Sequence, residues 1–200
     1  EDLLSSITVP TLVLSARDDA MGWRPDEARR TCAAIPDGRV EEVAGRRLRA
    51  VVDSCNGAGS VVAPRLLEAL GAEVFALNVT PDGLFPRGAE PVPENLGALM
   101  AAVREHGADV GFAQDMDADR LAVVNERGEA VGEEYTLVLA ARYVLGRERG
   151  PVVANLSTTD ALDAVAAAAG CPVYRSKSGE ANVTEEMRRV GAVVGGEGNG

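Results

Sequence analysis

Short apolar runs alternate with longer amphipathic segments along most of the chain. The run RAVVD at 49–53 predicts a buried strand, and segment 60–70, which stops at Gly71, predicts a helix. Further strands are predicted at 73–77, 109–113, 121–124, 152–155, 172–175 and 192–194, and further helices at 94–105, 133–145, 159–169 and 181–190. The alternation is typical of an α/β fold with layered, mixed or parallel sheets and flanking helices.

Composition and charge narrow the class of protein. The 200 residues allow one or two domains, and a hydrophobic share of 46% is enough for a packed core. The net charge of −11 argues against a general nucleic-acid binder, which needs a basic stripe. No run is long enough to span a membrane and no signal peptide heads the chain, so we expect no membrane partner. Cys32, Cys55 and Cys171 form no C-x-x-C pair, which argues against a zinc site and favours a reduced, cytoplasmic setting.

Residues 1–45 form a short α/β unit of their own, with strands predicted at 11–15 and 39–43 and a helix at 25–35. The segments ITVPTLVLSARDD and EARRTCAAIPDGRVEEVAG are similar to the C-terminal part of an α/β-hydrolase. This resemblance implies Asp18 or Asp19 as the acid of a catalytic triad.

The other members of such a triad are absent from the sequence. Where a histidine should follow the second strand, Gly45 is followed by Arg46 and Arg47, and no G-x-S-x-G elbow occurs. The hydrolase machinery therefore cannot work within this chain. The alternatives are a turn with two solvated aspartates and, for residues 36–49, a linker that belongs to the following unit.

The sequence DMDADR places Asp115, Asp117 and Asp119 at alternate positions between two predicted strands. In a loop, this spacing allows three carboxylates to surround one hard cation, and Mg²⁺ prefers such oxygen ligands. A cation would also relieve the repulsion between the three charges. Arg120 adds a planar cation suited to a phosphate, so the loop predicts a magnesium site for phosphoryl transfer.

Two other interpretations of this loop remain. One is an exposed acidic loop without a metal. The other is an EF-hand calcium loop, because Glu126 stands at the twelfth position. Arg120, however, occupies the position that needs glycine, and the flanking segments predict strands rather than helices.

The acidic loop and its surroundings resemble the α-D-phosphohexomutases, the group of phosphoglucomutases, phosphomannomutases and phosphoglucosamine mutases. DMDADRLAVVNERGE is similar to the D-x-D-x-D-R metal loop of this family. The resemblance covers about residues 47–200, and the other segments that carry it are VVDSCNGAGS, PDGLFPRGAEPVPENL, GEEYTLVLAA, SKSGEANV and GGEGNG.

The resemblance implies roles for individual residues. In the family, a phosphoserine on the first domain donates its phosphoryl group to a hexose monophosphate, and Mg²⁺ bridges that phosphoserine. Asp115, Asp117 and Asp119 would hold the metal. Arg120 and Lys177 would be catalytic residues near the substrate. Glu197 and Asn199 would bind the sugar hydroxyls, although many members carry serine at the position of Asn199.

The resemblance also implies a domain organisation. Residues 46–148 correspond to the second mutase-type domain and 149–200 to an incomplete third domain, after the hydrolase-like segment 1–45. No phosphoserine loop like T-A-S-H-N-P occurs, and the sequence ends within the expected sugar loop, so we expect a fragment without mutase turnover of its own. The predicted native reaction is 1-to-6 phosphoryl transfer on a hexose phosphate. The alternatives are a non-catalytic remnant that binds magnesium or sugar phosphate and a hydrolase fusion remnant.

Overall fold

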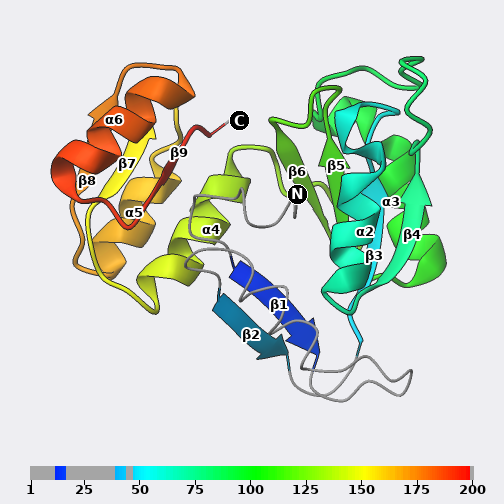
Figure 1. The fold of residues 1–200 in the computed structure, drawn as a ribbon, viewed down its shortest axis with the longest axis horizontal. Coiled ribbons are helices and arrows are strands. Elements are labelled where there is room, and N and C mark those ends of the chain that lie inside the picture. The colour runs from blue at the N-terminus through cyan, green and yellow to red at the C-terminus, as the bar shows by residue number, and fades with distance from the viewer. Residues whose placement is uncertain (1–11, 17–38, 44–46, 199–200) are drawn as a thin grey trace, which may run out of the picture.

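The computed structural model describes residues 12–16, 39–43 and 47–198. Most of these residues belong to two sheets and the helices that cover them (Figure 1). Strands and helices alternate along both parts, as the apolar pattern predicts. The α/β fold class with mixed and parallel sheets is therefore confirmed.

The first sheet has four strands in the order β4-β3-β5-β6. Strands β3 (Arg49–Asp53), β4 (Glu73–Leu77) and β5 (Val110–Gln114) are parallel, and β6 (Leu121–Asn125) pairs with β5 in the antiparallel sense. The three parallel strands therefore end at one edge of the sheet, and the acidic loop leaves from that edge.

Helices α2 (Val62–Ala69) and α3 (Gly97–His106) flank this sheet. Because β4 and β5 lie on opposite sides of β3, right-handed crossovers place the two helices on opposite faces. Leu99 and Val103 of α3 are fully buried against Val51 of β3. The first core therefore lies between α3 and the sheet.

The second sheet has three parallel strands in the order β8-β7-β9. They are β7 (Val152–Asn155), β8 (Val173–Ser176) and β9 (Val194–Gly196). All four residues of β7 are buried, as expected for the central strand of a sheet covered on both faces.

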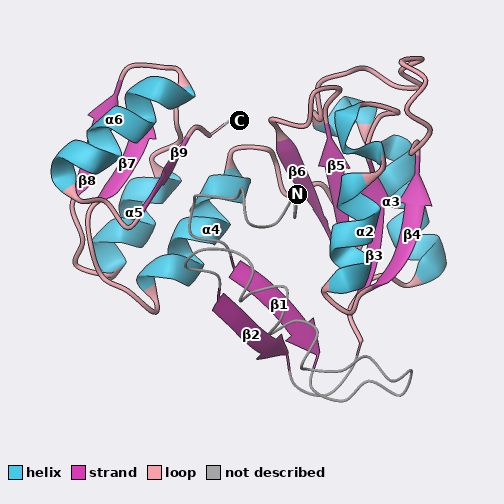
Figure 2. Ribbon diagram, in the orientation of Figure 1, coloured by secondary structure: helices cyan, strands magenta, loops and turns pink. Residues whose placement is uncertain are grey.

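Helices α4 (Tyr135–Leu145), α5 (Ala161–Ala168) and α6 (Glu180–Val190) cover the second sheet (Figure 2). Two neighbouring glycines of β9 show how they are arranged. A Cβ on Gly195 would meet Met187 of α6, and a Cβ on Gly196 would meet Leu137 of α4. Since successive residues of a strand face opposite sides, α6 and α4 lie on opposite faces.

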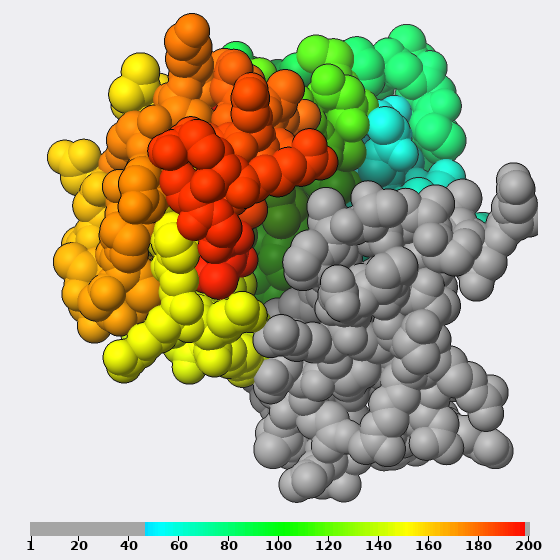
Figure 3. Space-filling model, turned by 60° about the vertical axis from the view of Figure 1, so that its left-hand side comes forward, coloured from blue at the N-terminus to red at the C-terminus, as the bar shows by residue number. Residues whose placement is uncertain are grey.

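Helix α4 shares a core with β7 and α5, although a boundary at residue 148 groups it with the first sheet. Ala141 and Leu145 pack with Val152 and Leu162 in this second core. Each sheet and the helices that cover it are called a unit here. Helix α4 also contacts the first unit, because the Thr136 hydroxyl donates a hydrogen bond to the carbonyl of Leu121 in β6. In the space-filling view, the orange and red surface of the second unit lies beside the green surface of the first (Figure 3).

Strands β1 (Leu12–Ala16) and β2 (Arg39–Val43) form a separate parallel pair close to the predicted positions 11–15 and 39–43. The predicted helix 25–35 and the candidate acids Asp18 and Asp19 lie outside the described residues. Within the described ranges, no helix is both long and apolar enough to cross a bilayer.

The boundaries of several elements differ from the prediction by one to three residues. The helix expected at 60–70 starts only after a 3-10 turn at Ala58–Ser60, and the one expected at 94–105 starts after a 3-10 turn at Pro93–Asn95. Pro93 fixes the first position of its turn but has no N–H to donate. The last strand lies at Val194–Gly196 instead of 192–194, because two glycines that lower the apolar signal are part of it.

Candidate functional site

The acidic loop, residues 115–120, connects β5 to β6 at the edge where the parallel strands β3, β4 and β5 end. In open α/β sheets, ligands bind outside the carboxyl ends of such strands. The loop is therefore placed where a binding site is expected from topology alone.

The three aspartates of this loop come together. One carboxylate oxygen from each of Asp115, Asp117 and Asp119 lies within 4.8 Å of the others. Asp115 is buried, whereas Asp117 and Asp119 are exposed. Ala118 between them has a φ of 66°, a left-handed conformation that folds the loop back on itself.

These carboxylates fit a magnesium ion. Two oxygens bound to one Mg²⁺ lie at most about 4.2 Å apart, because each bond is about 2.1 Å long. The observed spread of up to 4.8 Å closes with small rotations of the exposed Asp117 and Asp119. Hard oxygen donors of this kind suit Mg²⁺ better than a softer transition metal.

Arg120 borders the acidic cluster and interacts with it through backbone and side chain. Its backbone N–H donates to Asp115 Oδ1 at 3.2 Å, and its Nε lies 3.5 Å from Asp115 Oδ2. Its Nη1 lies 3.6 Å from Glu90 in the proline-rich loop. The guanidinium is about one-third exposed, so part of it remains open to a phosphate.

A glycine-containing turn after β3 packs directly against the backbone of the acidic loop. The Ala58 N–H donates to the Met116 carbonyl at 2.8 Å. A Cβ on Gly57 would lie 2.2 Å from the same carbonyl oxygen, closer than real Cβ atoms approach. Glycine is required here because the backbone of the loop lies directly against it.

A buried ion pair lies beneath the same loop. Asp53, at the end of β3, is fully buried and accepts a hydrogen bond from Arg87 Nε at 3.1 Å. It also accepts from the Asn78 amide and the Cys55 N–H, at 3.0 and 2.9 Å. Arg87 in turn donates to the carbonyl of Gln114, the residue before Asp115. The pair therefore connects the ends of β3 and β5 under the candidate metal site.

Burial raises the pKa of the Cys55 thiol above its ordinary value, and the Asp53 and Asp115 carboxylates act in the same direction. The Arg87 guanidinium opposes this shift. The thiol therefore stays protonated at neutral pH and acts as a small packing group next to the acidic loop.

A second polar cluster lies where the strands of the second sheet end. Glu197 directly follows β9, and its Oε1 accepts hydrogen bonds from Asn155 Nδ2 at 2.9 Å and the Gly179 N–H at 2.6 Å. Lys177 directly follows β8 and is exposed. Asn199, the other predicted sugar-binding residue, lies outside the described part of the chain.

The start of α4 lies between the two clusters. Thr136 bonds to Leu121, the residue after the acidic loop, and Glu134 Oε2 accepts the Thr159 N–H at 2.9 Å. A Cβ on Gly198 would lie 2.3 Å from the same Glu134 oxygen. Residues 134–136 therefore contact residues that adjoin each cluster, namely Leu121 after the acidic loop and Gly198 after Glu197.

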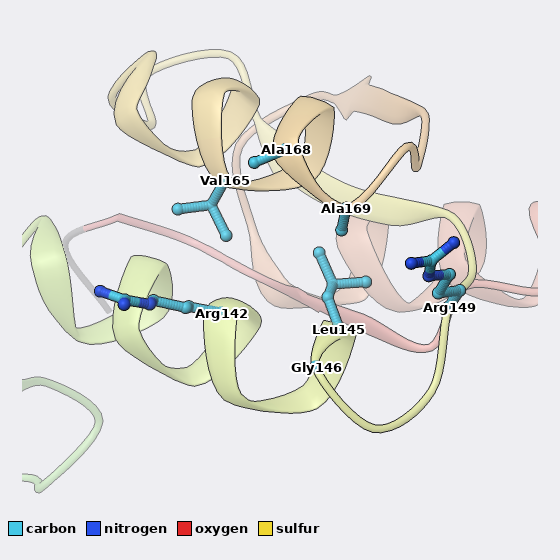
Figure 4. Close-up of a pocket in the computed structure, with 7 residues that line it drawn as sticks. All are labelled: Arg142, Leu145, Gly146, Arg149, Val165, Ala168 and Ala169. Atoms are coloured by element: carbon cyan, nitrogen blue, oxygen red, sulfur yellow. The ribbon is translucent and has the colours of Figure 1, made fainter.

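A cavity of about 290 Å³ lies elsewhere, between α4 and α5 (Figure 4). It has an apolar floor that includes Leu145 and Val165, with Arg142 and Arg149 at its margins. It contains none of the predicted site residues.

Comparison with known proteins assigns the two parts of the chain. Residues 32–128 match the family model described as "Phosphoglucomutase/phosphomannomutase, alpha/beta/alpha domain II", and residues 132–200 match the corresponding domain III. The chain belongs to this family. The resemblance to the α-D-phosphohexomutases is thereby confirmed.

Individual phosphohexomutases match over most of the chain. A "Probable phosphoglucosamine mutase" of Methanopyrus kandleri is 44% identical over 79% of this chain, and a "Phosphoglucomutase/phosphomannomutase" of Thermococcus kodakarensis is 42% identical over 80%. The matches span 35% and 36% of those proteins, so the chain covers about a third of their length. The crystal structure of a phosphoglucomutase/phosphomannomutase family protein from Burkholderia thailandensis matches 87% of this chain and 44% of its own, with a TM-score of 0.70 and 28% identity.

The flanking strands and the range of the family match bear on two of the alternative interpretations. The acidic loop is flanked by β5 and β6 rather than by helices, so the EF-hand interpretation is wrong. The domain II match begins at residue 32 and so overlaps the segment 1–45. The hydrolase resemblance of that segment stays a prediction.

Sequence reasoning missed the residues that hold the candidate site in place. The buried pair Asp53–Arg87 and the partners of Glu197, Asn155 among them, were not singled out. A signal was present in two cases, since Asp53 and Asn155 are polar residues that end apolar strands, RAVVD and VVAN. No local signal marked Arg87, which comes from a loop.

Proposed function

We propose that this chain supplies the metal-binding and sugar-binding parts of a magnesium-dependent phosphohexomutase. The reaction is the intramolecular transfer of a phosphoryl group between positions 1 and 6 of a hexose phosphate. The phosphoserine that carries this group belongs to a part of such proteins that the 200 residues do not match. The names of the relatives support glucose, mannose and glucosamine phosphates as the substrate class.

One observation carries the proposal. Asp115, Asp117 and Asp119 converge at the carboxyl edge of a parallel sheet, with Arg120 beside them. A magnesium ion held there would neutralise charge on a phosphoryl group in transfer. The Arg120 guanidinium would bind an oxygen of the same group, and the carboxylates would keep the guanidinium in position.

The second cluster suits the rest of the substrate. Lys177 would attract the negatively charged phosphate, because it is an exposed cationic residue that directly follows β8. Glu197 would accept a hydrogen bond from a sugar hydroxyl, and we assign the neighbouring Asn199 the same role from the family resemblance. Residues 134–136 contact Leu121 next to the first cluster and Gly198 next to Glu197, which supports the use of both clusters on one ligand.

A magnesium titration tests the proposal. We expect the wild-type chain to bind one Mg²⁺ in isothermal titration calorimetry with MgCl₂. Because the loss of an outer partner of a metal site costs about 10–100-fold in affinity, Asp117→Ala, which removes a direct ligand, should weaken binding at least about tenfold.

Glu126→Ala is the matched control. Glu126 is an exposed carboxylate eleven positions after Asp115, in the turn after β6, and only an EF-hand would need it. This variant should bind Mg²⁺ like the wild type. Equal heats from the wild type and Asp117→Ala would refute the assignment of the metal loop.

A further inference from the structure

Three loops meet at the carboxyl edge of the second sheet because β7, β8 and β9 are all parallel. Residues 156–159 follow β7, residues 177–179 follow β8, and residues 197–198 follow β9, and Asn155 is the last residue of β7. Glu197 connects them, since its Oε1 accepts hydrogen bonds from Asn155 and from the Gly179 N–H. Gly179 is the N-cap of α6, and a carboxylate at the N-terminus of a helix is also favoured by the helix dipole.

The Asn155 side chain is held in one orientation by a continuous hydrogen-bond network. Asn155 is 2% exposed, and its Oδ1 accepts the Thr158 hydroxyl proton at 2.6 Å. The Thr158 oxygen accepts the Gly198 N–H at 3.0 Å. Because the amide oxygen is used by Thr158, the amide N–H₂ must point to Glu197.

The backbone of the same loop is fixed independently. Arg175 donates from Nη1 to the carbonyls of Asn155 and Thr158, at 3.0 and 2.9 Å. Glu134 accepts the N–H of the next residue, Thr159. Asn155 is therefore held both through its side-chain amide oxygen and through the backbone of its loop.

We propose that Asn155 and Thr158 are positioning residues that orient the Glu197 carboxylate toward one hydroxyl of the hexose. Oε1 of Glu197 is occupied by two protein donors, whereas Oε2 has no partner among the described residues. A carboxylate oxygen can only accept, so its partner must be a donor such as a sugar hydroxyl. The inference rests on the proposed function, because that function supplies the sugar.

The same geometry links two predicted substrate contacts. The Gly179 N–H that binds Glu197 belongs to the loop that carries Lys177. A displaced Glu197 would therefore also release the loop that presents the lysine ammonium to the substrate phosphate. Asn155 touches neither group of the ligand and acts only through Glu197.

The experiment compares binding of glucose 1-phosphate by the full chain, the Asn155→Asp variant and a control, using ligand-detected NMR titrations at about pH 8 and about pH 5. At the higher pH, the introduced carboxylate repels Glu197, and affinity should fall about tenfold, as for the loss of a hydrogen bond to a charged group. At the lower pH, the two carboxyls share a proton that restores the bond, and most of the affinity should return. Asn155→Ala has no such group and should stay weak at both pH values.

The control is Asn125→Asp, which makes the same change at an asparagine that also donates to a glutamate, Glu129, in the first unit. It should bind like the wild type. The charged groups on elements around Glu197 are Glu134, Arg175, Lys177 and Glu180. These groups are the same in all variants. A recovery of affinity at low pH that only Asn155→Asp shows therefore comes from the contact between residue 155 and Glu197.

The outcomes separate the two proposals. If the wild type binds and Asn155→Asp binds equally well at both pH values, the positioning role is refuted and the proposed function stands. If the wild type shows no binding while it binds Mg²⁺, the sugar-binding role proposed for this chain is refuted, and the positioning role with it. A loss in Asn155→Asp without recovery at low pH indicates misfolding of the loop and likewise overturns the inference.

Discussion

The Arg87→Met substitution should lower the free energy of unfolding by about 3–5 kcal/mol relative to the wild type. The side chains of Arg87 and Asp53 are 8% and 1% exposed, and the substitution leaves the Asp53 charge buried with only neutral partners. Urea denaturation followed by circular dichroism measures the change.

Two further variants sharpen this test. Asp53→Asn combined with Arg87→Met removes the stranded charge, so the double variant should recover part of the lost stability. Arg127→Met breaks an ion pair with Glu129 in which both side chains are more than half exposed, and it should have little effect. If Arg87→Met proved as mild as Arg127→Met, the buried pair would not stabilise the fold as described.

Truncation of Leu162 should have an effect of similar size in the second core. Leu162 is fully buried, and Leu162→Ala should lower the free energy of unfolding by about 2–5 kcal/mol. Leu84→Ala is the control, because Leu84 is 73% exposed and its loss leaves no cavity.

Hydrogen exchange of the Leu162→Ala variant also tests where the chain divides into units. Because α4 shares its core with Leu162, amides of α4 and β7 should lose protection together, while those of β3 and β5 keep theirs. We propose on this packing that the units divide between β6 and α4. Retained protection of α4 together with β3 and β5 would favour the boundary at residue 148.

The sequence was sufficient for features that depend on local pattern. The alternation of apolar and amphipathic segments predicted the described elements from β3 to β9, because each signal lies within one element. The acidic loop was equally visible, since three aspartates at alternate positions need no distant residue to be noticed.

Contacts between distant segments could not be predicted in this way. Arg87 and Asp53 are 34 residues apart, and Asn155 and Glu197 are 42 apart. No periodicity connects such pairs, and only the fold brings the ends of the strands together. The 3-10 turns before α2 and α3 were missed for a different reason, because their last residues, Ser60 and Asn95, fall within the helical pattern that predicted the helices at 60–70 and 94–105.

The antiparallel pairing of β5 with β6 has a consequence for the order of folding. The two strands are joined only by the acidic loop, and their register begins with Gln114 opposite Leu121. Such a hairpin has low contact order and closes at little entropic cost, whereas β3 and β5 must pair across the 60 positions between Ala50 and Val110. We infer that the acidic loop forms early and that its Arg87 support docks later. Interactions made after the transition state act mainly on the unfolding rate, so Arg87 would extend the lifetime of the folded site rather than speed its formation.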